Sequence, residues 1–495
     1  MKPTAIFAAP CLFILVFTSM KSKIPLILFA LCVSFSFSLG AAEKPNMIFI
    51  IADDCTFRDI GCYGGQAKTP NIDKLAIEGM LFERCFQAAP MCSPTRHNIY
   101  TGIYPVKSGA YPNHTNAYPE VKSIVHQLEP LGYRVAQTGK THIGPESVFP
   151  FERLGASKAL DIEGIDKLMA ETAGGGKPFC LFACSNEPHS PWNKGDASVY
   201  PPEEVKLPPY LVDTPELRDA FSRYLAEITY YDDQVGQVLA SLEKSGLADN
   251  TLVMVVSEQG NSFPFAKWTC YDHGLQSAMI VRWPGQVEAG SVAKAMVEYV
   301  DVTPTFIDVA GGEPIAPVDG KSFLGVLKGE TDHHKDHVYG IMTTRGIING
   351  SEAYGIRSVR GDQYKLIVNL NHETQFTNAC TKSVEFKSMV AKAEAGNKKA
   401  KRLVDAYHFR PALELYDMKA DPLERKNIAE NPEYASVIEG LQAKLDAWMT
   451  DQGDEGLETE LRALERQGRN LKGDASKPKG KKKGKGKKKQ GEPTN

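Results

Sequence analysis

Short, almost continuous apolar runs recur along the chain, and they constrain its fold more than any other feature. The clearest is NMIFIIA at residues 46–52, which has no polar face over a whole strand length. Such runs are typical of strands that are buried on both faces of a parallel sheet. Similar runs follow at 179–183, 252–256 and 279–283, with a weaker one at 133–137.

Helical patterns lie between these runs. Residues 71–79 follow Pro70 and end at a glycine, and residues 217–242 carry apolar side chains at three- and four-residue spacing. Strands that alternate with helices predict an α/β sandwich with a large, mainly parallel central sheet, here assigned to residues 43–340. Ligands of such sheets bind beyond the carboxyl ends of the strands, so a functional site is expected there.

Residues 341–450 have a different pattern, which predicts a smaller C-terminal α+β subdomain with an antiparallel sheet. YGIRSVRGDQYKLIVNL at 354–370 indicates a hairpin with its turn at Gly361-Asp362. A further strand is expected at 413–417 and an amphipathic helix at 435–449. We expect this subdomain to pack against the main sheet.

The N-terminal residues have the composition of a targeting segment. Met20 begins a basic MKSK stretch, followed by a long apolar stretch and the small residues GAA before Glu43. This pattern predicts a secretory signal peptide at 1–42, with Met20 as the true start. An uncleaved anchor is the alternative, although a membrane span prefers about 20 apolar residues. We therefore expect export to the periplasm or the extracellular space, without stable membrane insertion.

Charge is distributed unevenly behind a formal net value of −3. Residues 472–495 contain ten lysines, so the body of the chain is strongly acidic. The Lys/Gly-rich residues 451–495 predict a disordered tail, which is either a tether to an anionic glycan or cell surface or a solvated end without a partner. No nucleic-acid partner is expected.

Export also permits disulfides. Eight of the ten cysteines lie beyond the leader. An even number invites pairing, but the sequence does not determine which cysteines would pair.

Two sequence features at the predicted strand ends contain side chains that could bind a ligand or take part in a reaction. Asp53 and Asp54 follow the first strand, where adjacent carboxylates repel one another unless a cation or protons neutralise them; the pair could also cap the next element. In CSPTRHNIYTG at 92–102, Pro94 suits a first helical turn, so Cys92 should lie at a helix N-terminus with Arg96 one turn further in. That spot suits an oxyanion, while the alternative is a buried or disulfide-bonded cysteine.

The 92–102 stretch resembles the signature of the type I sulfatases, Cys-x-Pro-x-Arg followed by Thr-Gly, in the alkaline-phosphatase superfamily. Further similar motifs follow in the family's order over roughly residues 45–430: TPNID at 69–73, GKTH at 139–142, PHSP at 188–191, LYD at 415–417 and DP at 421–422. The resemblance implies an alkaline-phosphatase-like fold and one Ca²⁺ per chain. It also implies that a formylglycine-generating enzyme converts Cys92 to formylglycine (3-oxoalanine).

The same resemblance implies a role for each matching residue. Asp53, Asp54 and the side chain of residue 92 would bind Ca²⁺. Lys140 and His142 are two residues apart in a segment expected to be extended, so both should point to one side. The residues that would contact the sulfate, the formylglycine hydrate or the leaving group are Arg96, Lys140, His142, Lys267 and, as general acid, His189.

One motif departs from the family pattern. Sulfatases usually complete the metal site with Ser-Asp-His-Gly or Ser-Asp-Asn-Gly after a late strand, whereas this chain has Ser-Glu-Gln-Gly at 257–260 and Asp272-His273-Gly274 further along. The apolar run 252–256 precedes the first motif. We therefore predict Glu258 and Gln259 as metal ligands, with Asp272 and His273 as the alternative.

These observations converge on an exported, calcium-dependent sulfatase that acts on sulfate esters or N-sulfate of a sulfated carbohydrate. The stretch GNSFPFAK at 260–267 resembles sulfamidase-like members, which cleave N-sulfated glucosamine. A phosphate or phosphonate monoester hydrolase of the same superfamily and a catalytically silent glycan-binding protein stay open as alternatives. Candidates for lining a sugar pocket, or simply for packing, are His97, Trp192, His273 and Arg282.

Overall fold

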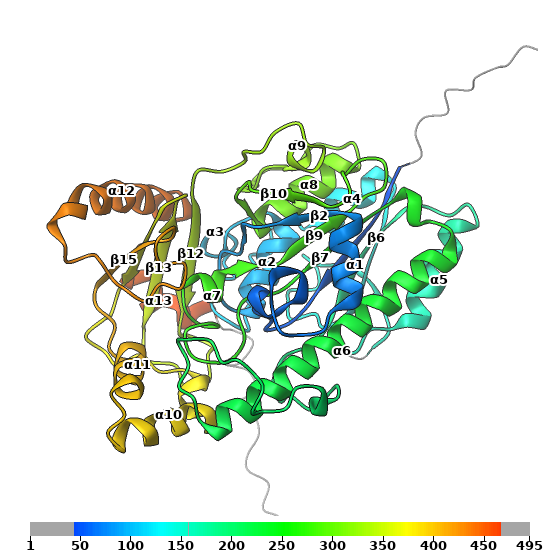
Figure 1. Cartoon of the computed structure of the whole chain (residues 1–495). Helices are drawn as coiled ribbons and strands as arrows, with labels where there is room; N and C mark the ends of the chain where they lie inside the picture. Colours follow the sequence, from blue (N-terminus) through cyan, green and yellow to red (C-terminus); the bar gives the residue numbers. More distant parts are fainter. Residues whose placement is uncertain (1–43, 157, 467–495) are drawn as a thin grey trace, which may run out of the picture. The chain divides into compact units, whose positions relative to one another are not determined.

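The centre of the fold is an eight-stranded sheet with the order β10-β2-β9-β7-β1-β6-β4-β5 (Figure 1). The structure is a computed structural model, and it describes residues 44–156 and 158–466. Only β9 runs antiparallel to both of its neighbours. The strands in sheet order are Ser291–Ala293, Met80–Phe82, Met279–Arg282, Thr251–Val256, Asn46–Ile51, Phe179–Cys184, Arg134–Gly139 and Glu152–Leu154. The predicted mainly parallel sheet is confirmed.

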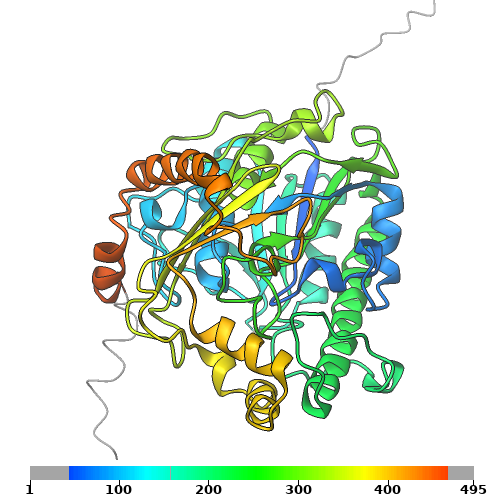
Figure 2. The same ribbon diagram turned by 60° about the vertical axis from the view of Figure 1, so that its left-hand side comes forward.

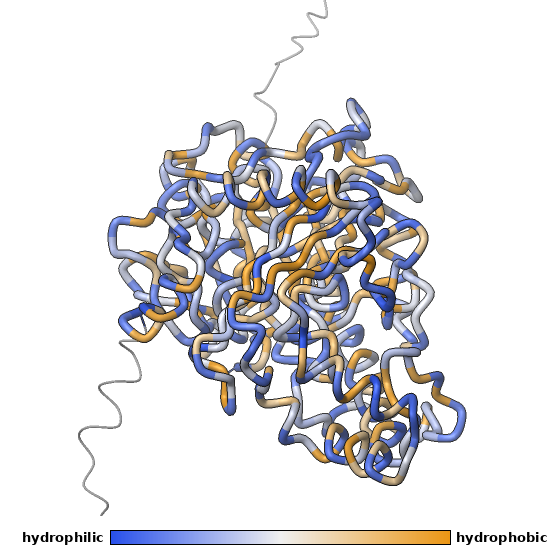
Figure 3. Tube along the Cα trace, turned by 90° about the vertical axis from the view of Figure 1, so that its left-hand side faces the viewer, coloured by the Kyte–Doolittle hydropathy of each residue, from blue (hydrophilic) through white to orange (hydrophobic). Residues whose placement is uncertain are grey.

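Strand β1 is buried on both faces, which explains its unbroken apolar sequence. Ile48 and Ile50 belong to one hydrophobic cluster, while Met47, Phe49 and Ile51 belong to another. Successive side chains of a strand point to opposite faces, so helices must cover both sides of the sheet. The first cluster includes residues of α1 (Pro70–Glu78), α5 (Ile162–Ala173) and α6 (Pro215–Ser245), and the second includes residues of α2 (Cys92–Thr101), α4 (Ile124–Leu128) and α8 (Val302–Val309). In Figure 3 apolar segments fill the interior.

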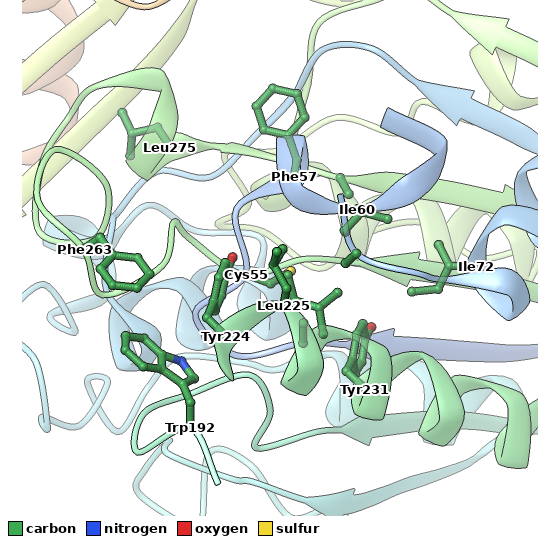
Figure 4. Packing of buried hydrophobic residues seen from close by; sticks show 14 of the residues in the cluster. Cys55, Phe57, Ile60, Ile72, Trp192, Tyr224, Leu225, Tyr231, Phe263 and Leu275 are labelled. Atoms are coloured by element: carbon green, nitrogen blue, oxygen red, sulfur yellow. The ribbon is translucent and has the colours of Figure 1, made fainter. Parts of the chain in front are cut away.

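The sequence around helix α6 explains where this helix begins and ends. Thr214 caps its first turn by accepting a hydrogen bond from the backbone N–H of Leu217, and Pro215 is its first residue. Gly246 ends it with φ 72°, a left-handed conformation that glycine adopts without strain. Tyr224, Leu225 and Tyr231 on this helix pack into the first cluster (Figure 4).

A separate sheet has the antiparallel order β12-β13-β14-β15, and α12 lies against it (Figure 2). Its elements confirm the predicted hairpin, strand and closing helix. They are β12 (Val338–Thr343), β13 (Gly355–Arg360), β14 (Tyr364–Asn369), β15 (Leu413–Asp417) and α12 (Ala435–Gln452). Helices α10 (Val384–Glu394) and α11 (Lys398–His408), which were not predicted, lie between β14 and β15 in the chain, and α10 contacts α6.

The remaining elements are short. A three-stranded sheet consists of β11 (Val297–Glu298), β3 (Cys85–Phe86) and β8 (Gln276–Ser277). Two-residue strands leave no periodicity to detect, so this sheet was not predicted. The short helices are α3 (Pro105–Ser108), α7 (Asp272–Leu275), α9 (Leu324–Leu327) and α13 (Leu457–Arg462).

The prediction of a tail without structure from residue 451 is wrong for 451–466. Helix α12 continues to Gln452, α13 follows, and a 3-10 turn reaches Arg466. The fully buried guanidinium of Arg357 pairs with Asp454 and, at 2.9 Å, with Glu460. This segment is held by distant partners, which a local pattern does not reveal. The rest of the predicted tail and the predicted leader at 1–42 lie outside the described residues.

Two further observations concern export-related predictions. All eight cysteines between Cys55 and Cys380 are free, so no disulfide joins the described residues. None of the helices within 44–466 combines the length and the apolar character of a membrane span.

Candidate active site

Four parallel strands deliver the predicted site residues to one edge of the central sheet. Strands β7, β1, β6 and β4 are consecutive neighbours, so their carboxyl ends lie together. The residues that follow them are, in this order, Glu258 and Gln259, then Asp53 and Asp54, then His189, then Lys140 and His142. A cavity of about 590 Å³ opens at this edge, and Cys92, Lys140, His142, His189 and Lys267 line it.

Cys92 is the first residue of α2, as predicted, and the whole helix is buried. The backbone of Met91 accepts a hydrogen bond from the N–H of Thr95, whose hydroxyl donates to the carbonyl of Ala89 at 2.6 Å. Gly102 ends the helix with φ 68°. These bonds place the side chain of residue 92 at the positive end of the helix dipole.

Three carboxylates gather around Cys92. Ligand atoms of Asp53, Asp54, Glu258 and Cys92 all lie within 4.8 Å of one another. The side-chain amide of Gln259 donates to Asp54 Oδ1 at 2.7 Å and lies 3.0 Å from Cys92 Sγ. Asp53 Oδ1 and Gln259 Oε1 are buried without a hydrogen-bond partner in the described structure. An oxygen-rich, partly unsatisfied donor set of this kind fits a hard divalent cation such as Ca²⁺.

A cation faces each carboxylate. Arg96 Nε lies 2.7 Å from Glu258 Oε1, Lys267 Nζ lies 2.6 Å from Asp54 Oδ1, and Lys140 Nζ contacts Asp53 Oδ2. Arg96 is fully buried and also donates to the backbone carbonyl of Lys140 at 3.3 Å. The positive and negative charges of the cluster therefore balance locally, although the body of the chain is acidic.

Burial and these charges displace several pKa values. Burial acts to raise the pKa of Asp53, but Lys140 and His189 outweigh it and hold the value well below its ordinary range. Burial raises the pKa of Glu258 to about 8 against the effect of Arg96. Burial, reinforced by Asp53, raises the pKa of Cys92 to about 12, so the unmodified side chain is a thiol near neutral pH in this environment.

His189 sits in the loop after β6, at the mouth of the cavity. Cis peptide bonds precede Pro188 and Pro191 on either side of it. Its Nδ1 lies 2.7 Å from the carbonyl oxygen of Ser190, which can only accept, so Nδ1 carries the proton. Nε2 is then directed toward Asp54, 3.6 Å from Oδ2.

A histidine that the sequence analysis missed contacts the site. His114 Nδ1 lies 2.6 Å from His142 Nε2, and both rings line the cavity. Burial, Lys140 and His114 lower the pKa of His142 to about 2. His142 has φ 54°, so its segment is not extended as predicted, although Lys140 and His142 do line the same cavity. His114 is a single histidine in a loop, and no spacing pattern marks it.

Aromatic side chains form part of the cavity wall. The rings of Trp192 and Phe263, both labelled in Figure 4, lie beside one another. They stack with centroids 4.8 Å apart, and Trp268 lies beside Lys267. Trp192 is thus the one of the four sugar-pocket candidates that lines this cavity. Arg282 instead lies 3.3 Å from Glu78, and His273 lines a different cavity.

His97 was also a sugar-pocket candidate, and its ring is enclosed in the core. Its Nδ1 donates to the backbone carbonyl of Ser93 at 2.7 Å, and its Nε2 accepts from the backbone N–H of Gly144 at 3.2 Å. A fully buried imidazole with both nitrogens occupied packs α2 against its surroundings.

The alternative metal ligands lie elsewhere. Asp272 begins α7 and pairs with Arg360 at 3.0 Å and with Lys365 at 2.8 Å. These partners, with burial opposing them, lower its pKa. Glu258 lies in the carboxylate cluster and Asp272 does not, because only the former follows a strand of the central sheet.

Comparisons with known proteins agree with this geometry. The family model Sulfatase matches residues 45–312, and that of the N-sulphoglucosamine sulphohydrolase C-terminal region matches residues 260–394. An ulvan-active sulfatase of Formosa agariphila is 34% identical, covering 84% of this chain and 82% of the relative. Human N-sulphoglucosamine sulphohydrolase is 27% identical, covering 84% and 92%.

A solved structure shares the fold. It is titled as BT4656 in complex with its substrate D-glucosamine-2-N,6-O-disulfate, and it superposes with a TM-score of 0.62 at 21% identity, covering 84% of this chain and 100% of that one. Family model and relatives together settle the classification: this chain belongs to the sulfatase family and is a sulfuric ester hydrolase.

Proposed function

We propose that this protein is an exported, calcium-dependent sulfatase that hydrolyses sulfate esters or N-sulfate of a sulfated carbohydrate, using a formylglycine formed from Cys92. The observation that carries the proposal is the placement of Cys92. It lies at the start of α2, within 4.8 Å of three carboxylates, and it lines a cavity with aromatic walls.

The metal would be held by Asp53, Asp54, Glu258, Gln259 and the side chain of residue 92. Their oxygen atoms suit Ca²⁺, and the unpartnered oxygens of Asp53 and Gln259 support this assignment. When bound, Ca²⁺ supplies positive charge that stabilises the sulfate oxygens and the ionised form of the attacking hydroxyl. The chain's own contribution is to hold the ligands rigidly, because all five of these residues are buried.

The nucleophile would come from the modified residue 92. As its hydrate, formylglycine supplies one hydroxyl that attacks sulfur and a second through which the aldehyde re-forms with release of sulfate. Arg96, one turn further along α2, would orient the hydrate. Lys140, His142 and Lys267 line the cavity next to it and would hold the sulfate oxygens.

His189 would protonate the leaving oxygen or nitrogen. Its Nδ1 proton is engaged by Ser190, which leaves Nε2 as the atom that carries and delivers a proton. Its side chain is 35% exposed, so it can reach a substrate that enters from the cavity mouth. The sulfated sugar beyond it would contact Trp192 and Trp268, since aromatic faces suit pyranose rings. The relatives' names, an ulvan-active sulfatase and an N-sulphoglucosamine sulphohydrolase, support this substrate class.

Peptide mass spectrometry of the protein expressed with a formylglycine-generating enzyme tests the nucleophile. We expect the mass of residue 92 to correspond to formylglycine in active material, and Cys92→Ala to abolish hydrolysis of an aryl sulfate. Cys62→Ser is the matched control, because Cys62 is half-buried and lies outside the site. Active natural protein with an unmodified Cys92 would overturn the mechanism, and preference for an aryl phosphate would favour the phosphate hydrolase.

The substrate class and export need separate measurements. A screen over defined O- and N-sulfated oligosaccharides should identify one whose sulfate group is released faster than that of the aryl sulfate. N-terminal sequencing of the protein recovered outside the cytoplasm should begin near Glu43. Recovery of full-length chain from the cytoplasm alone would contradict export.

A further inference from the structure

A second cavity, of about 440 Å³, lies on the other side of the segment that follows β7. Phe263, Lys267 and Trp268 of this segment line the active-site cavity. Phe265 and Tyr271, from the same segment, line the second cavity. One segment therefore contributes a wall to both.

His273 forms part of the buried wall of this cavity. It is 2% exposed, and its Nε2 has no hydrogen-bond partner in the part of the chain that the structure describes. The ring of Tyr210 packs edge-on against it with centroids 4.3 Å apart. Burial, with a contribution from Arg58, lowers the pKa of His273 to about 3, so the imidazole is neutral near pH 7. A buried, unpartnered imidazole nitrogen is costly unless a ligand pairs with it.

Positive charge gathers at the mouth. Arg402 on α11 and Arg425 after β15 are exposed and line the cavity. Neither forms an ion pair with a carboxylate among residues 44–466, and the carboxylate that lines this cavity, Glu424, is paired with Lys365 at 2.8 Å. Both act on Lys399, whose pKa is lowered by burial and by these two arginines, so three cations lie near one another. Uncompensated guanidinium groups at a cavity mouth suit a sulfate or carboxylate group.

We propose that the second cavity is a non-catalytic binding site for a sulfated pyranose residue of the glycan substrate, an inference that rests on the proposed function. The arginines would bind the sulfate group, Nε2 of His273 would pair with a ring hydroxyl, and Tyr210 and Tyr271 would contact the apolar face of the sugar. Nothing in this wall resembles the nucleophile and carboxylate cluster around Cys92, so the site would hold the glycan without cleaving it.

Calorimetry on the Cys92→Ala protein, which does not consume its ligand, tests the site with a heparin-derived sulfated hexasaccharide. We expect the double variant Arg402→Ala/Arg425→Ala to bind it at least about threefold more weakly, since solvent-exposed ion pairs are individually modest. Lys401→Ala is the matched control: Lys401 is exposed on the same helix, is paired with Asp405, and does not line the cavity. Its binding should equal that of the parent protein.

Kinetics separate this proposal from the proposed function. With residue 92 intact, the double variant should raise KM for a sulfated polysaccharide by a similar factor and leave kcat and aryl sulfate hydrolysis unchanged. His273→Phe, which keeps the size but removes the nitrogen, should weaken hexasaccharide binding as well. The second site would be overturned if both variants bound the hexasaccharide as tightly as the parent protein does. It would also be overturned if the parent protein bound inorganic sulfate as tightly as the hexasaccharide. Failure to hydrolyse any sulfate would instead overturn the proposed function, while calorimetry would still report on the cavity.

Discussion

Glu258 is the residue at which this chain departs most from its family's pattern, and its geometry makes a sharp prediction. Glu258→Gln removes one of three clustered carboxylates but keeps the side-chain volume, so bound calcium and aryl sulfate turnover should both fall, the latter by about 100-fold or more. Asp272→Asn should keep both, because Asp272 contacts Arg360 and Lys365 and lies outside the cluster. Atomic emission measures calcium per chain. Retention of calcium by Glu258→Gln together with its loss in Asp272→Asn would reverse the assignment.

Asp59 carries a penalty that depends on pH. Burial raises its pKa from 3.8 to about 7, although Tyr224 and Asn261 donate hydrogen bonds to it. Because the folded-state value is the higher one, the free energy of unfolding should decline as pH rises from about 4 to about 7 and then level off.

Asp59→Asn tests this penalty, because the amide keeps an acceptor oxygen and never ionises. At pH 8 the variant should be more stable than the natural protein by about 2–4 kcal/mol, and the advantage should shrink as pH falls toward 4. Denaturant unfolding at several pH values measures it. An advantage that does not change with pH would mean that packing rather than charge is responsible.

At the scale of elements, the last described segment holds a loop of the active site. Arg466 donates to the carbonyls of Gly109 and Asn116 at 3.0 Å and 3.1 Å, and its guanidinium lies 4.0 Å from the centroid of the Tyr118 ring. The loop between these residues carries His114, which contacts His142. The C-terminal segment therefore positions a cavity wall that is distant in sequence.

Arg466→Ala should therefore lower kcat/KM although Arg466 does not line the active-site cavity. A displacement of about 1 Å at His142 is enough to cost about tenfold or more in kcat/KM. Arg462→Ala is the control, since Arg462 lies on α13 and pairs with Glu455 rather than with the loop. Aryl sulfate kinetics together with the thermal midpoint give the readout. Equal kcat/KM in the two variants at equal stability would rule out the positioning role.

Elements differ in how far the sequence predicts them. Strand β1 was predictable because burial on both faces leaves an unbroken apolar run, and residues at the ends of parallel strands converge whatever the loops do. The position of Cys92 was predictable because Pro94 suits the first turn of a helix and a family motif surrounds it. His114, Arg402 and Arg466 were not, because only tertiary contacts bring their segments to a cavity or a loop.

At the scale of the whole molecule, the charges separate by location. The cations of the cluster around Cys92, namely Arg96, Lys140 and Lys267, are buried beside carboxylates at one edge of the central sheet, and each is paired there. The lysines beyond residue 471 are the largest uncompensated positive charge in the sequence. We therefore predict two separate tasks: the tail lysines attract a sulfated polymer at long range, and the cluster around Cys92 recognises one sulfate group.

Deleting residues 467–495 should separate these two tasks. The deletion removes ten lysines and stops short of the segment that pairs with Arg357 and the 109–118 loop, so aryl sulfate turnover should not change. Binding to an immobilised sulfated polysaccharide should weaken, so the shortened protein should elute at a lower salt concentration. Salt elutes the protein because it screens exposed charges, over about 8 Å at physiological ionic strength. A full-length chain with these lysines replaced by glutamine should elute like the deletion. If both elute with the natural protein, the tail is a solvated end and the body alone accounts for retention of the polymer.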